Sequence, residues 1–371
     1  MQTRVVMCVD FDYFFAQCEE MRNPSLRDKP VVVCVYSGRT EESGAVSTAN
    51  YLARRYGVKS GMPIYLAKKK LQNSDAVFLP VNRELYEEVS ETTMAILRSF
   101  ADHFEQAGID EAYLDISQRT GGNFEEARKV AKAMKDEVKR QQGPSCTIGV
   151  GPNKLVAKIA VDAQKPDGLT IVNPEQVENF LSPLPVRRLL GVGAKTEQKL
   201  RILGVQMIGE LARYDVQGLT EIFGKSLGGY FRRASMGVDD DPVQERSEAE
   251  SISRISTLKE DTRNMDSIVE KTNQLCEEIH TRLVQSGLVF RSVSIAAVMK
   301  DLSIRSRSHT LDNYTDEIDV IKKVSKTLFE ELLKGSELDI RRVGVKVSKF
   351  TSREEEQRQI TEYSSTSTEA K

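Results

Sequence analysis

The chain has 371 residues, of which 39% are hydrophobic, and its formal net charge at pH 7 is −2. This length allows more than one hydrophobic core, and the composition is ordinary for folded globular domains. There is no apolar run of roughly 18 residues or more and no basic-then-apolar leader, so we expect a soluble, cytoplasmic protein that does not associate with membranes.

Two apolar strands in the first third of the chain each meet a group of carboxylates. One ends at Asp10, and the other begins at Tyr113, directly after Asp110, Glu111 and one alanine. Adjacent residues of a regular strand point to opposite faces, so Asp110 and Glu111 can share a site only at a bend. A hairpin beside the first strand would gather all three acids. Such oxygen ligands suit a hard cation such as Mg²⁺, and two ions about 4 Å apart would clamp a phosphoryl transfer. Solvated acids at strand ends are the alternative.

The expected elements of the first 150 residues follow the order β-α-β-β-α-β of a split βαβ arrangement. They are strands over 4–10 and 145–150, two strands that flank the Asp110-Glu111 pair, and helices over 84–104 and 123–140. An insertion after the first strand, roughly 13–77, contains a strand over 30–36 and a helical stretch over 49–56.

Two residue pairs in this insertion have side chains suited to nucleotides. Phe14 and Phe15 directly follow the first strand, so their N–H groups can face a triphosphate, although two core aromatics at a helix start give the same pattern. Tyr51 and Arg54 are three residues apart on one helical face. A phenol and a guanidinium there can hold phosphate oxygens together, or they form an ordinary surface pair.

The segment 189–200 has the features of a phosphate-binding turn. Gly191 and Gly193 predict a tight turn between two helices, with bare amides at the start of the second helix where a DNA phosphate can approach. Lys195 and Lys199 are four residues apart and line the same side. An ordinary turn between helices is the alternative.

From Ser251 the pattern again predicts β-α-β-β-α-β. The strands are expected over 252–258, 289–300, 302–310 and 341–350, and the helices over 266–285 and 316–334. The last strand alternates valines with cations and small residues, and Arg305 and Arg307 alternate in the same way. The predicted sheet therefore offers a basic face that can contact phosphates without reading bases, or it has an ordinary charged outer face.

These motifs together resemble those of Y-family translesion DNA polymerases, and most closely the archaeal, DinB (Pol IV)-like branch. The resemblance rests on Asp10-Phe11-Asp12-Tyr13-Phe14-Phe15-Ala16-Gln17-Cys18-Glu19-Glu20, Ile109-Asp110-Glu111-Ala112-Tyr113-Leu114-Asp115, and the stretches 43–51 and 147–154. The similarity runs in order from about residue 4 to residue 350.

The resemblance implies an α+β multidomain fold, a right-hand polymerase with a ferredoxin-like palm, small fingers, a helical helix-hairpin-helix thumb and a β-α-β-β-α-β little finger. The implied domains are a palm at 1–12 and 78–170, fingers at 13–77, a thumb at 171–236, an acidic linker at 237–250, a little finger at 251–350 and a flexible tail at 351–371.

The implied activity is that of a DNA-directed DNA polymerase, which transfers nucleotides from dNTPs to a primer 3′-OH with low fidelity and little or no proofreading. Asp10, Asp110 and Glu111 are the expected catalytic residues and, with the Phe11 carbonyl, the ligands of two Mg²⁺ ions, for which Mn²⁺ can substitute. Phe15 is the expected steric gate against a ribose 2′-OH. The expected nucleotide contacts are Tyr13, Phe14, Phe15, Thr48, Tyr51, Arg54 and Lys165. The expected DNA contacts are Gly191, Gly193, Lys195, Lys199, Arg305, Arg307, Arg341, Arg342 and Lys346.

Two features depart from the family pattern. Gly108 stands where related sequences usually have Ser. In the tail, Gln357 to Tyr363 partly match a sliding-clamp peptide, but Ser364 stands where a second aromatic is usual. A clamp-binding tail and a disordered tail therefore both remain open. The expected partners are primer-template DNA and dNTPs, and the protein is expected to be a monomer.

Two other classes of protein share part of this pattern. Nucleotide cyclases use a split βαβ palm with paired acids but no template, and the helix-hairpin-helix and the basic last domain argue against them. A non-catalytic bypass scaffold would keep the DNA contacts and lose the metal-binding acids, whereas all three acids are present here.

Overall fold

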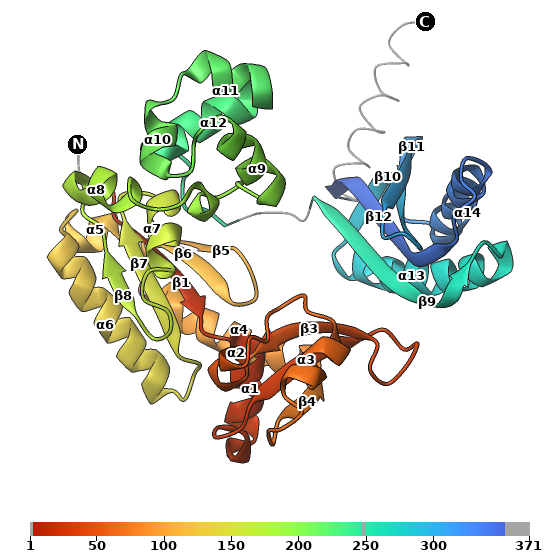
Figure 1. The fold of residues 1–371 in the computed structure, drawn as a ribbon, viewed down its shortest axis with the longest axis horizontal. Helices are drawn as coiled ribbons and strands as arrows, with labels where there is room; N and C mark the ends of the chain where they lie inside the picture. The colour runs from red at the N-terminus through yellow and green to blue at the C-terminus, as the bar shows by residue number, and fades with distance from the viewer. Residues whose placement is uncertain (1–2, 246–249, 353–371) are drawn as a thin grey trace, which may run out of the picture. The chain divides into compact units, whose positions relative to one another are not determined.

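The computed structural model describes residues 3–245 and 250–352. The chain forms two compact units (Figure 1). One comprises Met1–Val35, Val46–Met62 and Leu66–Arg246, and the other comprises Tyr36–Ala45, Pro63–Tyr65 and Ser247–Lys371. Among the described helices, none is both long and apolar enough to cross a membrane.

The first unit is built on a five-stranded sheet in the order β5-β6-β1-β7-β8. Its strands are β1 (Val6–Phe11), β5 (His103–Gln106), β6 (Glu111–Asp115), β7 (Cys146–Gly151) and β8 (Leu169–Ile171). The central strand β1 is antiparallel to both neighbours, as a split βαβ arrangement requires. The predicted order of elements is therefore present, with β8 added parallel to β7.

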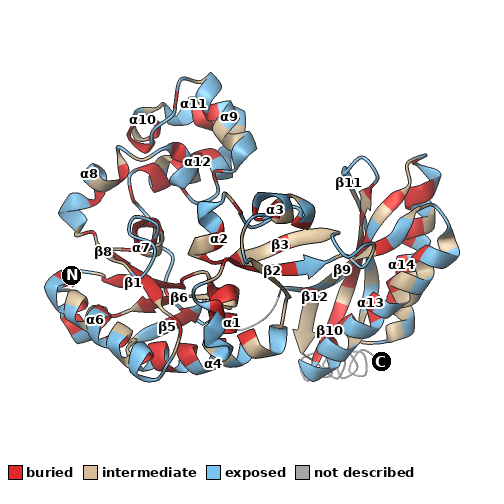
Figure 2. Ribbon diagram, turned by 60° about the horizontal axis from the view of Figure 1, so that its bottom comes forward, coloured by how far each residue is buried: buried red, intermediate tan, exposed pale blue. Residues whose placement is uncertain are grey.

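Helices cover both faces of this sheet, which explains why every residue of β1 is buried (Figure 2). Met7 and Val9 share one core with residues of α4 (Arg83–Ser99) and α6 (Phe124–Arg140). Val6 and Cys8 instead pack with Ala157 and Val161 of α7 (Lys154–Val161). Since strand residues alternate between faces, Asp10 lies on the α7 side. A short helix, α5 (Ser117–Thr120), follows β6.

The insertion after β1 forms a smaller layer of helices and strands. Its sheet has the order β3-β2-β4, built from β2 (Val31–Tyr36), β3 (Gly44–Ala49) and β4 (Val77–Pro80). Its helices are α1 (Phe14–Arg22), η1 (Pro24–Leu26), α2 (Tyr51–Arg55) and α3 (Ile64–Lys70). The buried side chain of Asn50 caps α2 through the Ala53 N–H and also donates to Glu20 at 2.8 Å, so it ties α2 to α1.

A group of short helices around its own apolar core follows the five-stranded sheet. The elements are η2 (Pro174–Gln176), α8 (Val177–Leu181), η3 (Val186–Arg188), α9 (Ala194–Ile202), α10 (Ile208–Arg213), α11 (Val216–Phe223) and α12 (Lys225–Ser235). The two-glycine segment lies directly before α9, as predicted.

The last part of the chain is a four-stranded antiparallel sheet in the order β11-β10-β12-β9. Its elements are β9 (Ser251–Thr262), α13 (Met265–Gln285), β10 (Leu288–Met299), β11 (Ile304–Thr315), α14 (Ile318–Lys334) and β12 (Ile340–Ser352). Both helices and the inward-facing strand residues form one buried core. The predicted element order is correct, but β11 extends five residues past the predicted end at 310 because its pairing with β10 resumes at Phe290↔Thr315 beyond a bulge.

Candidate active site

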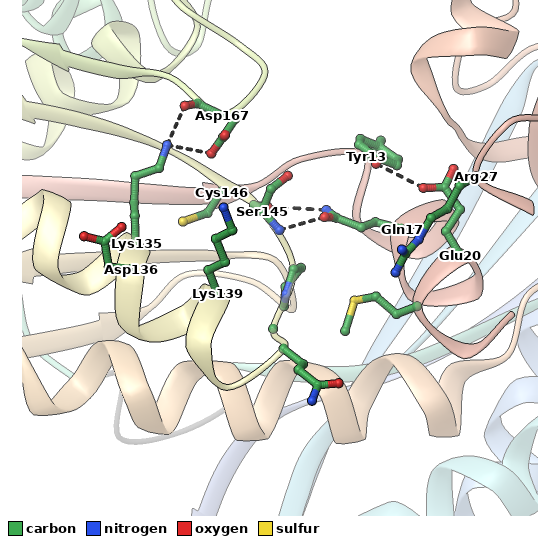
Figure 3. A pocket seen from close by; sticks show the side chains of 14 residues that line it. Tyr13, Gln17, Glu20, Arg27, Lys135, Asp136, Lys139, Ser145, Cys146 and Asp167 are labelled. Carbon is green, nitrogen blue, oxygen red and sulfur yellow. Dashed lines mark hydrogen bonds and ion pairs between the residues drawn. The ribbon is translucent and has the colours of Figure 1, made fainter. Parts of the chain in front are cut away.

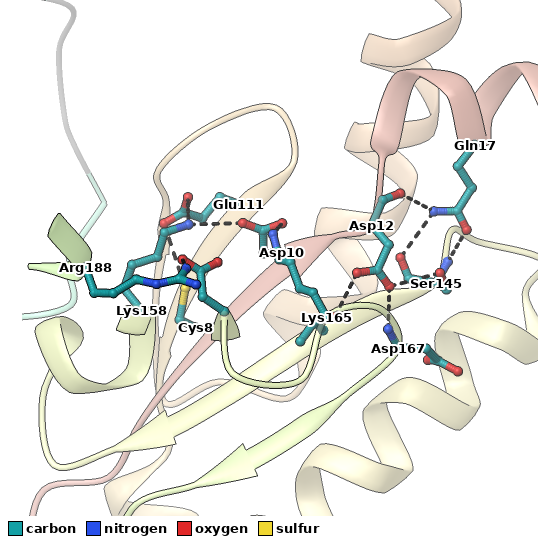
Figure 4. Close-up of polar contacts among 12 residues, drawn as sticks. Cys8, Asp10, Asp12, Gln17, Glu111, Ser145, Lys158, Lys165, Asp167 and Arg188 are labelled. Atoms are coloured by element: carbon teal, nitrogen blue, oxygen red, sulfur yellow. Dashed lines mark hydrogen bonds and ion pairs between the residues drawn. The ribbon is translucent and has the colours of Figure 1, made fainter. Parts of the chain in front are cut away.

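Asp10 and Glu111 form the centre of the site. They are direct partners in the antiparallel pairing of β1 with β6, so both carboxylates lie on the sheet face that α7 covers. The Nζ atom of Lys158 in α7 lies 3.0 Å from Asp10 Oδ2 and 2.5 Å from Glu111 Oε2 (Figure 4). Lys165 also forms an ion pair with Asp10. One cationic nitrogen thus already bridges two of the four predicted metal ligands.

Asp110 lies at the bend that the sequence predicts. The Phe11 N–H donates to the Asp110 carbonyl at 2.9 Å, which fixes this residue beside the end of β1. Burial, and after it the charge on Asp10, raises the pKa of Asp110 above its ordinary value. The hairpin therefore places Asp110 beside the end of β1, where the charges of Asp10 and Glu111 also disfavour its ionised form and raise its pKa.

The carboxylates of this site fit a divalent cation that is bound jointly by the protein and by the phosphates of a substrate. Within 3–245 and 250–352, no three His, Cys, Asp or Glu side chains converge into a ready-made cage. Mg²⁺ rarely uses such cages and is usually held by one or two carboxylates together with waters and phosphates. Asp10 and Glu111, which converge on a single ammonium, supply that type of carboxylate pair.

Lys158 is a site residue that the sequence reasoning missed. Burial acts to lower its pKa, but interactions with Cys8, Asp10 and Glu111 raise it above the ordinary value, so the side chain is a permanent cation here. The available signal was the helix Lys-Leu-Val-Ala-Lys-Ile-Ala-Val, in which only Lys154 and Lys158 are polar and lie one turn apart. Lys154 pairs with Glu105 at 2.7 Å.

The two aromatic residues after β1 have different environments. Phe14 is 2% exposed and packs on Phe11, with ring centroids 5.2 Å apart, so it belongs to the core. Phe15 is only partly buried and stacks on Tyr86 of α4. Tyr13 adopts a left-handed backbone conformation with φ of 36° at the start of α1, which turns the chain toward the fingers. Phe14 is therefore a core aromatic, and the partly buried Phe15 packs against the same core through Tyr86.

The remaining predicted nucleotide contacts lie around the start of α2. The Tyr51 ring meets Tyr13 edge-on at 5.3 Å, and the Arg54 guanidinium lies 4.8 Å from the centre of the Tyr51 ring. The buried Tyr51 hydroxyl has no well-formed hydrogen bond to any described residue. Burial, with the charges of Asp12 and Asp10, raises the pKa of Tyr51. Thr48 is half-buried at the end of β3.

The two-glycine segment has the predicted turn geometry. Gly191 has φ of +80°, a value that strongly favours glycine, and Gly193 is the N-cap residue of α9. Lys195 and Lys199 are both exposed on α9, and Lys199 Nζ lies 5.7 Å from the centre of the Phe223 ring. Two cations and the free amides of a helix N-terminus therefore lie within one short segment.

The last sheet has an open face, but two predicted residues lie on the other side. Arg342, Gly344 and Lys346 alternate with buried valines, as expected. Arg305 and Arg307, however, pair with Ala297 and Ile295, whose side chains are in the core, so they lie on the helix-covered side of edge strand β11.

The expectation that both arginines share the open face was therefore wrong. The Arg305 guanidinium donates instead to the Gly335 carbonyl at the end of α14, at 3.1 Å. On β11 the open face carries Ser306 and Ser308, opposite Ala296 and Ser294. Arg341 lies beside the bulge of β12, 3.8 Å from Asp261.

Comparison with known proteins identifies the class. Residues 9–162 match the impB/mucB/samB family, residues 249–361 match the C-terminal domain of that family, and residues 174–205 match its HHH motif. The chain is 46% identical to "DNA polymerase IV" of Nitrosopumilus maritimus, over 98% of this chain and 100% of that protein. It is 38% identical to "DNA polymerase IV" of Saccharolobus solfataricus, over 93% and 96% of the two chains.

Solved structures give the same result. A chimera of the Y-family DNA polymerases Dbh and Dpo4 superposes with a TM-score of 0.89 at 36% identity, covering 94% of this chain and 100% of that one. An insertion ternary complex of Dbh DNA polymerase gives 0.67 at 36% identity, again covering 94% and 100%. The protein is thus a member of the impB/mucB/samB family, in the DinB-like branch of the Y-family DNA polymerases. Its α+β fold is the palm, fingers, thumb and little finger architecture of that family.

Proposed function

We propose that this protein is a DNA-directed DNA polymerase that copies damaged templates with low fidelity. The observation that carries the proposal is the site at the end of β1, where Asp10 and Glu111 converge on one cation and Asp110 is fixed beside them. Relatives with the same architecture bear the name DNA polymerase IV or were solved as polymerase ternary complexes. The cyclase alternative has no support in this family.

The substrates are primer-template DNA and deoxynucleoside triphosphates, and a divalent metal ion serves the reaction. Asp10, Asp110, Glu111 and the Phe11 carbonyl would hold two Mg²⁺ ions, for which Mn²⁺ could substitute. When bound, the ions lower the pKa of the primer 3′-OH and neutralise charge on the triphosphate. Lys158 neutralises the Asp10–Glu111 pair before an ion enters, since it now bridges both carboxylates. The residues position the reactants, and no covalent intermediate is needed.

The nucleotide is held between the palm and α2. Thr48, Tyr51, Arg54 and Lys165 bind the triphosphate, and the backbone amides of Phe14 and Phe15 face it beside Tyr13. The buried Tyr51 hydroxyl, which makes no well-formed hydrogen bond to a described residue, and the cationic Arg54 and Lys165 support this assignment. Phe15 is the steric gate, because its partly exposed ring lies on a buried aromatic support.

The protein binds the phosphate backbone of DNA through two domains, the thumb and the little finger. The thumb contributes Gly191, Gly193, Lys195 and Lys199. The little finger contributes Arg342 and Lys346 from its open face, with Arg305 and Arg307 on the edge strand β11 and Arg341 on β12. Phosphate contacts of this type are independent of sequence, which suits an enzyme that must accept altered bases.

The domain boundaries proposed for this architecture are those predicted from the sequence. They are the palm at 1–12 and 78–170, the fingers at 13–77, the thumb at 171–236, the linker at 237–250 and the little finger at 251–350. The clamp-like peptide at 357–363 lies outside the described residues. Weak clamp binding through this tail, and a monomeric cytoplasmic enzyme, complete the proposal.

Primer extension tests the proposal. Wild-type protein, Mg²⁺ and four dNTPs on an undamaged template should give distributive extension, and Asp110→Ala and Glu111→Ala should abolish it while retaining DNA binding. Lys132→Ala, on the exposed side of α6, is the control and should extend normally. DNA binding without extension by the wild type would identify a scaffold instead.

A further inference from the structure

Asp12 is a buried carboxylate close to the catalytic acids that the chemistry above does not use. It is fully buried, and none of the described cations pairs with it. Its oxygens accept three hydrogen bonds from neutral donors, namely Thr147 Oγ1 at 2.7 Å, the Asp167 N–H at 2.9 Å and Ser145 Oγ at 3.1 Å (Figure 4). Burial of an unpaired carboxylate is costly, so these contacts should serve more than packing.

Contacts other than those of this carboxylate also hold the junction between β1 and β7. The Asp12 N–H donates to the Ser145 carbonyl at 3.0 Å, and the Gln17 amide accepts from the Ser145 N–H and donates to the Asp12 carbonyl, both at 2.6 Å. The two strands also pair along their length. Beyond this junction, the Asp12 carboxylate makes one further contact, in which it accepts a hydrogen bond from the Asp167 N–H.

Asp167 belongs to the turn 164–168, which carries Lys165. The turn is tight, since a Cβ on Gly168 would lie 2.0 Å from the Gln164 carbonyl oxygen. Asp167 has φ of +55°, a left-handed conformation that aspartate adopts more readily than most residues but that neighbouring contacts still help to hold. Residues 165–167 are exposed, so packing does not enforce it.

Hydrogen bonds hold both sides of Asp167 instead. Asp12 accepts from its N–H, and Lys135 Nζ of α6 donates to its carbonyl at 2.5 Å and pairs with its carboxylate at 2.8 Å (Figure 3). A cavity of about 770 Å³ lined by Lys135, Ser145 and Asp167 leaves this side of the turn without apolar support. The Ile148 N–H also donates to the Gly168 carbonyl at 3.1 Å, and Lys165 itself pairs with Asp10. The side chains that hold Asp167, and with it the turn that carries Lys165, are Asp12 and Lys135.

We propose that Asp12 is a positioning residue for the incoming nucleotide. Its carboxylate fixes the 164–168 turn, so the Lys165 ammonium is directed toward Asp10 and the triphosphate beside it. Lys135 has the same role from the other side of the turn. This inference rests on the proposed function, in which Lys165 binds the triphosphate.

The test measures the apparent dNTP Kd and the maximal rate in single-turnover extension by the full-length enzyme. Asp12→Asn keeps the shape of the side chain but removes the charge that strengthens the bond to the Asp167 N–H. We expect it to weaken dNTP binding on the order of tenfold, with a smaller change in maximal rate and unchanged primer-template affinity. Ser145→Ala, which removes one hydroxyl contact to Asp12 but not the turn contact, should change dNTP binding less.

The double variant with Lys165→Ala separates positioning from a structural role. If Asp12 acts through Lys165, Asp12→Asn should add little in the Lys165→Ala background. Full additivity of the two losses would overturn the inference. If Lys165→Ala alone leaves dNTP binding unchanged, the assignment of Lys165 under the proposed function fails instead.

Lys135→Met provides a second route if Asp12→Asn does not fold. Lys135 contacts the same turn from α6, and Met keeps most of its apolar stem. It should weaken dNTP binding in the same non-additive manner. Unchanged dNTP binding in both Asp12→Asn and Lys135→Met would also overturn the inference.

Discussion

The Phe15 ring stacks on the Tyr86 ring, with centroids 4.4 Å apart and an angle of 13° between the planes. Tyr86 is fully buried in α4, and its hydroxyl donates to Glu19 at 2.8 Å. The proposed gate from the fingers thus lies on a fixed aromatic surface of the palm. Such a stack contributes about 0.5–1.5 kcal/mol beyond its buried area, so the ring has little freedom to swing aside.

Phe15→Ala should relax the discrimination against ribonucleotides. The substitution empties the space that a ribose 2′-OH would need, so rNTP incorporation relative to dNTP incorporation should rise on the order of 100-fold, the range in which a pocket rejects one added hydroxyl. Single-nucleotide incorporation with each nucleotide type measures the ratio. The neighbouring core variant Phe14→Leu should lower stability and leave the ratio unchanged. Equal ratios in wild type and Phe15→Ala would exclude the gate.

Tyr86 should control the gate indirectly. Tyr86→Leu removes the flat support, so we expect a several-fold loss of ribonucleotide discrimination with Phe15 still present. Tyr86→Phe keeps the stack but loses the bond to Glu19, which should cost about 1 kcal/mol of stability and leave discrimination intact. Thermal melts and the incorporation ratio distinguish the two. A loss of discrimination in Tyr86→Phe would mean that the hydroxyl, rather than the stack, matters.

Lys195 and Lys199 should contribute to DNA affinity in a salt-dependent way. Each proposed phosphate contact releases a counterion, so Lys195→Ala and Lys199→Ala should each reduce the slope of log affinity against log salt by about 1. Fluorescence anisotropy with a primer-template duplex at several salt concentrations gives the slope. Lys132→Ala should leave it unchanged. An unaltered slope in both thumb variants would show that α9 does not contact DNA phosphates and that the segment is an ordinary turn between helices.

The sequence predicted most elements because local patterns determine them. Apolar alternation, glycine turns and charged strand ends gave the order of both β-α-β-β-α-β regions and the bend at Asp110 and Glu111. Arg305 and Arg307 were misplaced because alternation within one strand does not say which face the partner strand buries. Only the pairing with Ile295 and Ala297 decides that.

Long-range polar contacts were also beyond the sequence reasoning. Lys158 meets Asp10 across 148 positions of the chain, and the Asp167 N–H meets Asp12 across 155. No spacing rule joins residues so far apart. In the sequence, Asp12 was only one residue of the first carboxylate motif. Its contact with the turn 164–168 could be identified only from the structure.

The variant Gly108→Ser tests whether the serine hydroxyl that is usual at this position affects stability or activity. A Cβ at this position would meet nothing closer than Asp110 Oδ1 at 3.6 Å, so Gly108→Ser should fit without strain and change stability by less than about 0.5 kcal/mol. A serine hydroxyl there can donate to the Asp110 carboxylate, and we expect an extension rate within a few-fold of wild type. Thermal melts and steady-state extension check both statements. A large loss of stability would show that the hairpin requires glycine.

Asp110 should destabilise the metal-free protein at neutral pH. Its folded-state pKa is raised above the ordinary value of 3.8 by burial and by Asp10. The contribution of this group to stability is therefore present below that value and is lost as pH rises through the raised pKa. Asp110→Asn removes the repelled charge. We expect this variant to melt about 2–4 °C higher than wild type at pH 7 in EDTA, the shift that ~1 kcal/mol produces in a large domain.

Two further conditions separate this effect from improved packing. At a pH below 3.8 the wild-type carboxyl is protonated in both states, so the advantage of Asp110→Asn should disappear, whereas a packing gain would persist. Added Mg²⁺ should raise the melting temperature of wild type by mass action but have little effect on the variant, which lacks one anionic ligand. A variant that melts below wild type in EDTA at pH 7 would show that Lys158 already compensates the three acids. In that case, repulsion between Asp10, Asp110 and Glu111 would not destabilise the metal-free protein, and a bound cation would have no such repulsion to relieve.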